Sequence, residues 1–273
     1  MQNSIISFIG AGNMATCLIQ GLLKENFPAQ NIWATNNNLE QLNKLKNLNI
    51  NLTTDNRRAV QVADIVVLAV KPQILKRVAI EIADLIQAKK SLVISIAVSI
   101  DINSLEQYLS SKALAIVRCM PNTPALIGCG TTGLFANQYC SNTQKDAAES
   151  IFRSVGTIVW LPTEEQIDVV AALSGSGPAY FFLFMETLEQ AGVELGLSKE
   201  NANLLTLQTA LGSVRMAMES KKSLAELREQ VTSPGGTTER ALEFLKNSNF
   251  SDIVKKSLKA AKSRAEELAK DLK

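Results

Sequence analysis

Residues 5–15 read IISFIGAGNMA, and this stretch decides the fold of the first half of the chain. An apolar run of strand length leads directly into a G-x-G-x-x-A turn, and apolar residues at helical spacing follow the turn. Gly10 permits the tight turn, Gly12 leaves out the Cβ that would block a pyrophosphate, and Ala15 lets the helix pack closely on the strand. A glycine turn alone is weak evidence, but one placed between a strand and a helix at the start of a βαβ unit predicts a dinucleotide site. We expect the phosphates to meet free N–H groups at the helix N-terminus, formed by Gly10, Ala11, Gly12, Asn13 and Met14.

The end of the second strand indicates which dinucleotide binds. Sites for NAD usually place a carboxylate there to hold the ribose 2′-OH. This chain has Thr35, Asn36 and Asn37 instead, and no carboxylate precedes Glu40. Neutral amide and hydroxyl groups accommodate a 2′-phosphate, so we expect these three residues to bind NADPH, with NADH as the alternative because no arginine is present to grip that phosphate.

Periodicity divides the chain into two parts. Between residues 4 and 161, short runs rich in Ile and Val alternate with longer segments of helical period, which predicts a Rossmann-type parallel sheet with crossover helices. The apolar run at residues 65–70 is nearly continuous, so we expect cover on both sheet faces. From residue 163 onward only helical patterns remain. We therefore predict an α/β fold with an NADPH-binding domain at residues 1–162 and an all-α domain for dimerisation and substrate binding at residues 163–273. The expected strands are Ile5–Ile9, Asn31–Thr35, Asp64–Val70, Ser91–Ile96 and Ala115–Cys119.

One segment of the second part points to an oligomer. Residues 179–185 form an uninterrupted run of seven apolar residues, AYFFLFM. On a helix such a run covers every face and requires burial all round. In a domain of about 110 residues, a second subunit buries this helix more readily than one chain does. A central core helix of a monomer is the alternative.

Composition narrows the classes of function. The chain has 273 residues, with 28 basic and 26 acidic residues scattered along it and a net charge of +2, which does not favour nucleic acid as a partner. We identify no apolar run of the roughly 18 residues that span a bilayer and no charged start typical of a secretion signal, so we expect a cytoplasmic protein without a membrane partner. The four cysteines lack metal-site spacing and are expected to be reduced packing residues, so no metal is predicted. Histidine is absent, which excludes imidazole-based triads, a histidine acid and a histidine-ligated metal.

Four further segments, taken with the glycine turn, resemble pyrroline-5-carboxylate reductase. They are AVKPQ at 69–73, RCMPNTP at 118–124, LSGSGPAY at 173–180 and VTSPGGTT at 231–238. The resemblance implies a Rossmann domain followed by a helical domain that interlocks with that of a partner, giving homodimers that in many members assemble into decamers. It also implies hydride transfer from NAD(P)H to 1-pyrroline-5-carboxylate, the last step of proline biosynthesis.

The same resemblance implies further cofactor residues. Ala69, Val70, Lys71 and Pro72 resemble the wall beside the nicotinamide ribose, and they lie at the carboxyl edge of the sheet, where open α/β sheets bind ligands. Asn56 matches another position that contacts the cofactor, and Asn122 and Thr123 match the turn over the nicotinamide. For Lys71 the alternative is a solvated loop lysine.

Two segments, Ser174–Gly177 and Ser233–Thr238, are expected to bind the small-molecule substrate. Each pairs glycines with hydroxyl residues before an expected helix, which leaves N–H groups free for an anion such as the pyrroline carboxylate. Helix capping by Ser174 and Thr238 is the alternative. The resemblance implies that the carboxylate is held by the Ser233 hydroxyl and the N–H groups of Gly235 and Gly236, and that Thr238 faces the ring nitrogen as the catalytic residue. The expected substrate residues are Ser174, Gly175, Ser176, Gly177, Ser233, Gly235, Gly236, Thr237 and Thr238.

Two other functions are consistent with parts of the sequence. A β-hydroxyacid dehydrogenase shares the domain order, but its catalytic lysine on a Gly-rich helix has no counterpart between Gly175 and Met185. A non-catalytic NADPH-binding sensor or scaffold would need the first glycine loop but not the segment at 231–238. A protonated cyclic imine accepts hydride readily, so the reductase reaction mainly needs two reactants held in line and is compatible with a chain that lacks histidine.

Overall fold

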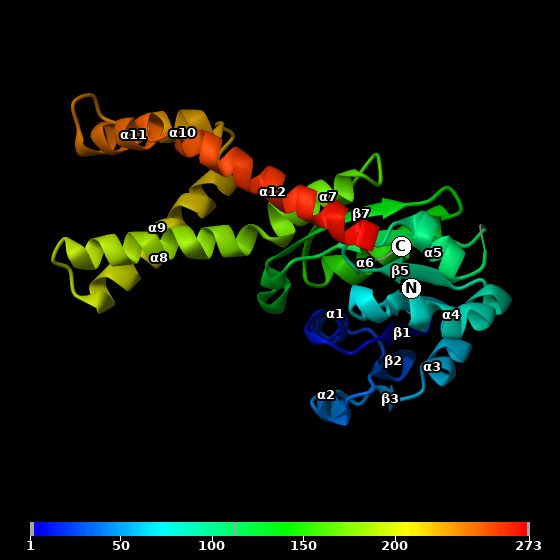
Figure 1. The fold of residues 1–273 in the computed structure, drawn as a ribbon. Coiled ribbons are helices and arrows are strands. Elements are labelled where there is room, and N and C mark those ends of the chain that lie inside the picture. The colour runs from blue at the N-terminus through cyan, green and yellow to red at the C-terminus, as the bar shows by residue number, and fades with distance from the viewer. Residues whose placement is uncertain (1–2, 112, 272–273) are drawn as a thin grey trace. The chain divides into compact units, whose positions relative to one another are not determined.

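The computed structural model describes residues 3–111 and 113–271 and contains an eight-stranded sheet in the order β3-β2-β1-β4-β5-β6-β7-β8 (Figure 1). All neighbouring strands pair in parallel except β6 and β7, which are antiparallel. The strands are β1 (Ile6–Ile9), β2 (Ile32–Thr35), β3 (Asn51–Thr53), β4 (Ile65–Leu68), β5 (Leu92–Ser95), β6 (Ile116–Met120), β7 (Gly130–Ala136) and β8 (Gly156–Trp160). The predicted Rossmann-type sheet is confirmed.

All five predicted strands are present, with bounds that differ by up to two residues. Three strands were not predicted: β3, β7 and β8. The three residues of β3 include Asn51 and Thr53, and β3 lies at the sheet edge. β7 contains two glycines and two threonines, and β8 at the other edge alternates half-buried and exposed residues. None of these strands has the continuous apolar run of a strand buried on both faces.

Helices cover both faces of the sheet, and every element after β8 among the described residues is helical. The α-helices are α1 (Asn13–Lys24), α2 (Leu39–Asn43), α3 (Asn56–Val62), α4 (Pro72–Lys89), α5 (Ile102–Tyr108), α6 (Asn142–Arg153), α7 (Gln166–Val170), α8 (Gly177–Glu194), α9 (Lys199–Glu219), α10 (Leu224–Gln230), α11 (Thr237–Asn247) and α12 (Phe250–Asp271). Short 3-10 segments lie at η1 (Ala29–Asn31), η2 (Lys46–Leu48) and η3 (Thr123–Ile127), and η4 (Ala171–Gly175) is a π-helical turn. The predicted change to helical structure after residue 163 is confirmed.

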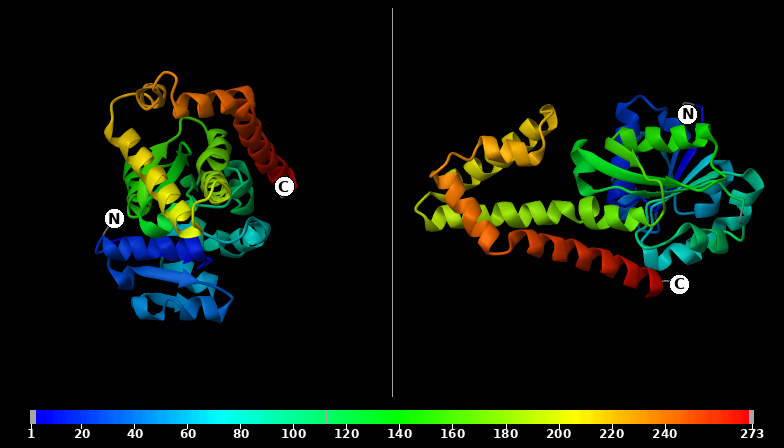
Figure 2. Two further views of the ribbon diagram at one scale, coloured as in Figure 1. Left: turned by 90° about the vertical axis from the view of Figure 1, so that its left-hand side faces the viewer. Right: turned by 90° about the horizontal axis from the view of Figure 1, so that it is seen from above.

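Two apolar cores lie against the sheet, one on each face. Phe8 and Val67 belong to the core under α1 and α6, whereas Val66 and Leu68 belong to the core under α3, α4 and α5. The right-hand view of Figure 2 shows α1 in blue and α6 in green on one side of the sheet, with the cyan helices on the other. Alternate residues of β4 therefore enter opposite cores, as its continuous apolar sequence predicted.

The chain forms two compact units, one made of the residues up to Ser176 together with those from Ala261 onward, the other of Gly177–Ala260. The first contains the whole sheet, and the second contains α8 to α11 and the start of α12. The functional division at residue 162 stays a prediction.

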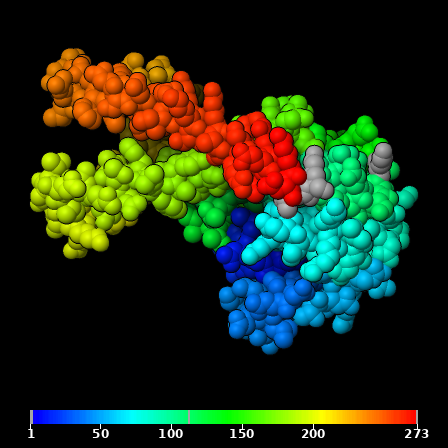
Figure 3. Space-filling model, in the orientation of Figure 1, coloured from blue at the N-terminus to red at the C-terminus, as the bar shows by residue number. Residues whose placement is uncertain are grey.

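Within the helical unit, the apolar residues of α8 lie at the surface of the chain. Phe181, Phe182 and Leu183 are 66%, 65% and 63% exposed. Figure 3 shows α8, in yellow-green, with its side chains in view. The alternative of a buried core helix in a monomer is therefore wrong, because a core helix would not leave three large apolar side chains in water.

One helical run among the described residues, Gln166–Glu194, is long and apolar enough to cross a membrane by length and composition. No run of that length was expected from the sequence, because polar residues interrupt the apolar ones in this segment. Only 22% of the most apolar window is buried. A helix that packs in an interface between subunits passes the same test, so this run is weak evidence for a membrane.

The cysteines allow a direct solution test of the packing. Cys17, Cys119 and Cys140 are buried, whereas Cys129 is exposed. Burial raises the pKa of Cys119 well above its usual value and that of Cys140 to about 11, so both stay as unreactive thiols at neutral pH. We expect a thiol reagent such as Ellman's to modify Cys129 alone in the native protein, and all four cysteines after unfolding in guanidinium. Rapid reaction of a second native thiol would contradict this burial.

Candidate active site

The glycine turn packs against the ends of β2 and β4. Gly10 has φ +99°, and a Cβ at this position would lie 2.7 Å from Val70 Cγ1 and 2.9 Å from the carbonyl carbon of Ala69. The N–H groups of Gly10 and Ala11 both donate to the carbonyl oxygen of Thr35, at 3.1 and 2.7 Å. Five predicted cofactor residues, distant in sequence, are thus brought together at the carboxyl edge of the sheet.

The N-terminus of α1 has the properties needed to bind a pyrophosphate. Gly12 is its N-cap residue, no side chain caps the helix, and its first turn contains no acidic residue. A Cβ at Gly12 would meet no atom within 4 Å, so there is open space beside the first-turn N–H groups. An uncapped helix start with space in front of it and a positive dipole end fits the phosphates of a dinucleotide.

The asparagines after β2 differ in the hydrogen bonds that their side chains make within the chain. Asn36 donates through Nδ2 to the Ala11 carbonyl at 3.2 Å and accepts from the Asn38 N–H at 2.9 Å. Asn38 in turn caps α2 by accepting from the Glu40 N–H. Asn37 is exposed. Asn36 therefore holds the loop in place, whereas the Asn37 side chain is open to solvent.

Thr35 and Asn56, both predicted cofactor residues, form a pair. The Thr35 hydroxyl is buried and donates to Asn56 Oδ1 at 2.7 Å, and Asn56 Nδ2 lies 3.4 Å from both carboxylate oxygens of Glu81. The Thr35 hydroxyl therefore holds the side-chain amide of Asn56 in place. Glu81, on α4, was not predicted as part of this site.

The segment after β4 forms the start of α4. Pro72 occupies the first turn and exposed Lys71 is the N-cap residue, without a side-chain capping hydrogen bond. Proline suits this position because its missing N–H would have no helical partner there. The contact of Lys71 with the cofactor stays a prediction, with the solvated loop lysine as its alternative.

Asn122 has a supporting position in the turn after β6. Its Nδ2 donates to the Ser174 carbonyl at 3.0 Å, and its Oδ1 accepts from the Thr131 N–H at 2.9 Å. The residue is buried, whereas Thr123 is exposed at the start of η3. Because both ends of its amide are engaged, Asn122 holds the turn in shape, and the predicted contacts of this turn with the nicotinamide stay a prediction.

The anion site at Ser174–Gly177 stays a prediction, and the segment does not have the geometry of an ordinary capped helix start. This segment joins the π turn η4 to α8, which begins at Gly177, within the helical run Gln166–Glu194. The Ser176 N–H donates to the Ala171 carbonyl at 2.8 Å in a π turn, and the Ser174 hydroxyl donates back to the Val170 carbonyl, so Ser174 is not a cap either. Gly175 is required by close packing instead, because a Cβ would lie 2.5 Å from Met120 Cε. π turns inside helices often occur at functional sites.

The segment Ser233–Thr238, in the helical unit, does precede a helix as predicted. Gly236 is the N-cap residue of α11, no side chain caps the helix, and Gly235 has φ +72°. The hydroxyls of Ser233, Thr237 and Thr238 make no hydrogen bond within the part of the chain that the structure describes. Helix capping therefore does not explain Thr238, and three hydroxyls remain available to a ligand.

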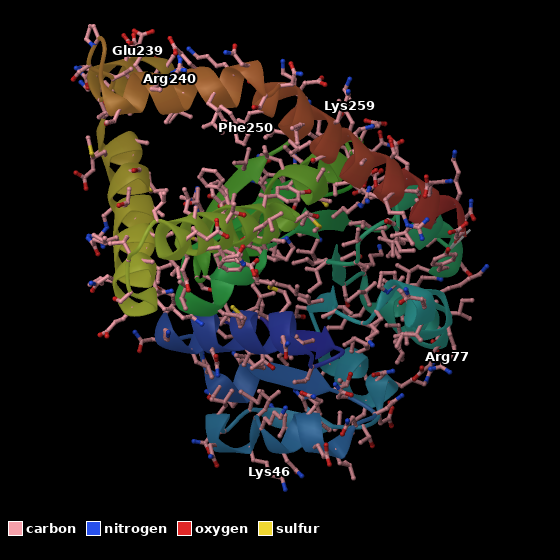
Figure 4. The ribbon with its side chains drawn as sticks, turned by 60° about the vertical axis from the view of Figure 1, so that its left-hand side comes forward. Lys46, Arg77, Glu239, Arg240, Phe250 and Lys259 are labelled. Carbon is pink, nitrogen blue, oxygen red and sulfur yellow. The ribbon has the colours of Figure 1, made fainter. Side chains whose placement is uncertain are left out.

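The two N–H groups expected to hold the substrate carboxylate already have partners in this segment. The Gly235 N–H donates to a carboxylate oxygen of Glu239 at 2.7 Å, and the Gly236 N–H donates to the Ser233 carbonyl at 3.0 Å. Figure 4 labels Glu239 beside Arg240 near the start of α11. Glu239 was not predicted as part of this segment, although an acidic residue in a first helical turn is a common partner for free N–H groups. A carboxylate thus already lies at Gly235.

Comparison with known proteins covers both parts of the chain. Residues 164–268 match the family described as pyrroline-5-carboxylate reductase dimerisation, and residues 5–99 match the family described as NADP oxidoreductase, coenzyme F420-dependent. A pyrroline-5-carboxylate reductase of Pseudomonas aeruginosa is 46% identical over 100% of this chain and 99% of its own length.

Solved structures agree with the sequence matches. The structure of a pyrroline-5-carboxylate reductase from Coxiella burnetii is similar with a TM-score of 0.92 and 48% identity, covering 97% of this chain and 98% of that one. The Plasmodium falciparum pyrroline carboxylate reductase with NADP bound gives a TM-score of 0.88 and 33% identity, covering 98% of this chain and 99% of that one. The similarity therefore extends over both units rather than over the dinucleotide-binding part alone.

Proposed function

This chain belongs to the pyrroline-5-carboxylate reductase family, and we propose that it reduces 1-pyrroline-5-carboxylate to L-proline with hydride from NADPH, the last step of proline biosynthesis. The observation that carries the proposal is the uncapped N-terminus of α1 with open space at Gly12, in a chain that matches this family over its whole length. NADH is the alternative cofactor.

In the proposed site, some residues bind NADPH, and others hold the binding residues in place. The first turn of α1 holds the pyrophosphate, Asn37 meets the 2′-phosphate, residues 69–72 line the nicotinamide ribose, and the turn at residues 121–123 lies over the nicotinamide. When bound, NADPH supplies the hydride. Thr35, Asn56 and Asn122 act by holding this edge of the sheet in place, because their hydrogen bonds are made within the chain.

The substrate contacts we propose involve the start of α11. The Ser233 hydroxyl and the N–H groups of Gly235 and Gly236 bind the carboxylate, which requires the Glu239 carboxylate to move away from Gly235. Thr238 contacts the ring nitrogen. The proton that converts the imine to an iminium comes from solution or from a water, since the chain has no histidine. Hydride then adds to the ring carbon of the iminium and leaves a neutral secondary amine.

We also propose a homodimer, with a decamer as its higher assembly, in the cytoplasm. The exposed apolar side chains of Phe181, Phe182 and Leu183 support a subunit interface, as does the match to a dimerisation family. The proposed functional domains are residues 1–162 for NADPH and residues 163–273 for dimerisation and substrate.

A single spectrophotometric assay tests the activity. Purified protein with NADPH and 1-pyrroline-5-carboxylate is expected to consume NADPH and form L-proline in equal amounts, and no consumption is expected without the imine. NADPH binding without turnover would support a sensor instead, and turnover with β-hydroxyacids but not with the imine would support the dehydrogenase. The six-membered piperideine carboxylate should be included, because one methylene is worth only about 1–3 kcal/mol of discrimination.

A further inference from the structure

A buried arginine lies between two carboxylates, outside the residues assigned above. Arg118 is on β6 and its side chain is 3% exposed. Its Nη1 lies 3.2 Å from Glu164 Oε1, and its Nη2 lies 2.9 Å from Asp168 Oδ1. The same Glu164 oxygen accepts the Ile102 N–H at 2.7 Å. We call Arg118, Glu164 and Asp168 the arginine cluster; it joins β6, the start of α5 and the region of α7.

Stability alone does not account for the arginine cluster. Buried ion pairs lose so much hydration that apolar replacements are often neutral or stabilising. Burial raises the pKa of Glu164 in spite of its contacts with Arg118 and the Ile102 N–H. Arg118 Nε is buried without a hydrogen-bond partner among the described residues, a further cost. What the cluster does provide is a fixed geometry between elements distant in sequence.

The arginine cluster positions the helical run that begins at Gln166 against β6. Arg118 and Met120 are two residues apart on β6 and therefore point to the same face. The run contacts β6 at Asp168 through the ion pair and at Gly175, whose missing Cβ leaves room for Met120. Asn122 lies two residues beyond the end of β6, and its Nδ2 donates to the Ser174 carbonyl.

These contacts determine the register of the helix along the strand. The arginine cluster fixes its beginning, and Asn122 and Met120 meet its π turn. A shift at Asp168 would therefore displace α7 and the π turn that follows it, and with them the Ser174 carbonyl that Asn122 binds. The turn at residues 121–123 thus depends on an ion pair that does not touch it.

We propose that Arg118, Glu164 and Asp168 are positioning residues for hydride transfer, because they hold the turn at residues 121–123 in the register that the nicotinamide requires. This inference rests on the proposed function, which places the nicotinamide under that turn. The planar guanidinium presents two N–H edges to two carboxylates at once, which the single ammonium group of lysine cannot do in the same geometry.

The test is Arg118→Lys, which keeps the positive charge and removes the planar guanidinium with its two N–H edges. At saturating NADPH and 1-pyrroline-5-carboxylate, kcat is expected to fall by about tenfold to a hundredfold, since small misplacement of reactants has effects of this size. The dissociation constant for NADPH, measured by fluorescence titration, should stay within about threefold, because the glycine turn is untouched. The deuterium isotope effect on kcat, with NADPH labelled at the transferred position, should rise as hydride transfer becomes rate-limiting.

Arg153→Lys is the matched control. Arg153 pairs with Glu149 on α6, and its side chain is 56% exposed, so the same substitution there should leave all three measurements unchanged. Glu164→Gln provides a second variant in case Arg118→Lys does not fold. It keeps an acceptor for the Ile102 N–H, removes one charge, and should lower kcat and raise the isotope effect in the same direction.

The outcomes separate the two proposals. A folded Arg118→Lys enzyme with wild-type kcat and isotope effect, differing only in melting temperature, would show a structural cluster and overturn this inference alone. A wild-type chain without turnover would overturn the proposed function, and this inference with it. Lower kcat with preserved NADPH affinity and a larger isotope effect supports both.

Discussion

Replacing Gly12 with valine is expected to abolish measurable NADPH binding, a loss of more than about a hundredfold in affinity. The isopropyl group would fill the open space in front of α1, where the pyrophosphate has to approach the first-turn N–H groups. Fluorescence titration of the variant with NADPH measures the effect directly.

The structure also predicts that Gly12→Val folds. A Cβ at Gly12 meets no atom within 4 Å, and its φ of −87° is open to any residue, so the stability cost should not exceed that of a poorer N-cap residue, about 1 kcal/mol. Gly10→Ala is the contrasting variant, because its φ of +99° and its close approach to Ala69 predict a clear drop in melting temperature. Wild-type NADPH affinity in folded Gly12→Val would disprove the assignment of the loop.

Replacing Thr238 with alanine is expected to lower turnover by about tenfold to a thousandfold, the range for loss of one positioned polar group. The Thr238 hydroxyl has no hydrogen-bond partner among the described residues, so its removal breaks no internal contact and should not destabilise α11. NADPH affinity should be unchanged, since the cofactor residues lie in the sheet unit. Steady-state kinetics with 1-pyrroline-5-carboxylate, combined with NADPH titration, separates these effects.

Thr238→Ser is the control for the hydroxyl. It keeps the oxygen and removes only the methyl group, so most of the turnover should return, within about fivefold of the wild type. If the alanine variant turned over at the wild-type rate, Thr238 would have no part in the reaction. If serine failed to restore turnover while alanine reduced it, the methyl group rather than the hydroxyl would be what matters.

Local patterns predicted the parts of the site that are built from neighbouring residues. The strand, glycine turn and helix around Gly12 interact within a few positions, so their geometry can be read from spacing. The same holds for the start of α11 at Gly236. At Ser174–Gly177, glycine and serine suggested a helix start, and α8 does begin at Gly177, but the π turn before it and the packing of Gly175 against Met120 were not predicted.

Pairings between distant residues could not be predicted in this way. Strands β7 and β8 are held by their neighbours in the sheet rather than by a strongly apolar sequence. The arginine cluster joins residues 46 and 50 positions apart. An arginine in an otherwise apolar strand was a visible signal of a buried charge, but nothing in the sequence identified its partners.

The sequence by itself determined the α/β class, the dinucleotide loop, the helical second part and the family, because each depends on short-range spacing or on motifs in a given order. Only the tertiary structure decided that the side-chain amides of Asn36 and Asn122 hydrogen-bond within the chain, that Glu239 lies at Gly235, and that Arg118 is held by two carboxylates. The physical reason is that a polar group takes whichever partner the folded chain brings within hydrogen-bonding distance, and that choice is made by the order of strands and the register of helices upon them.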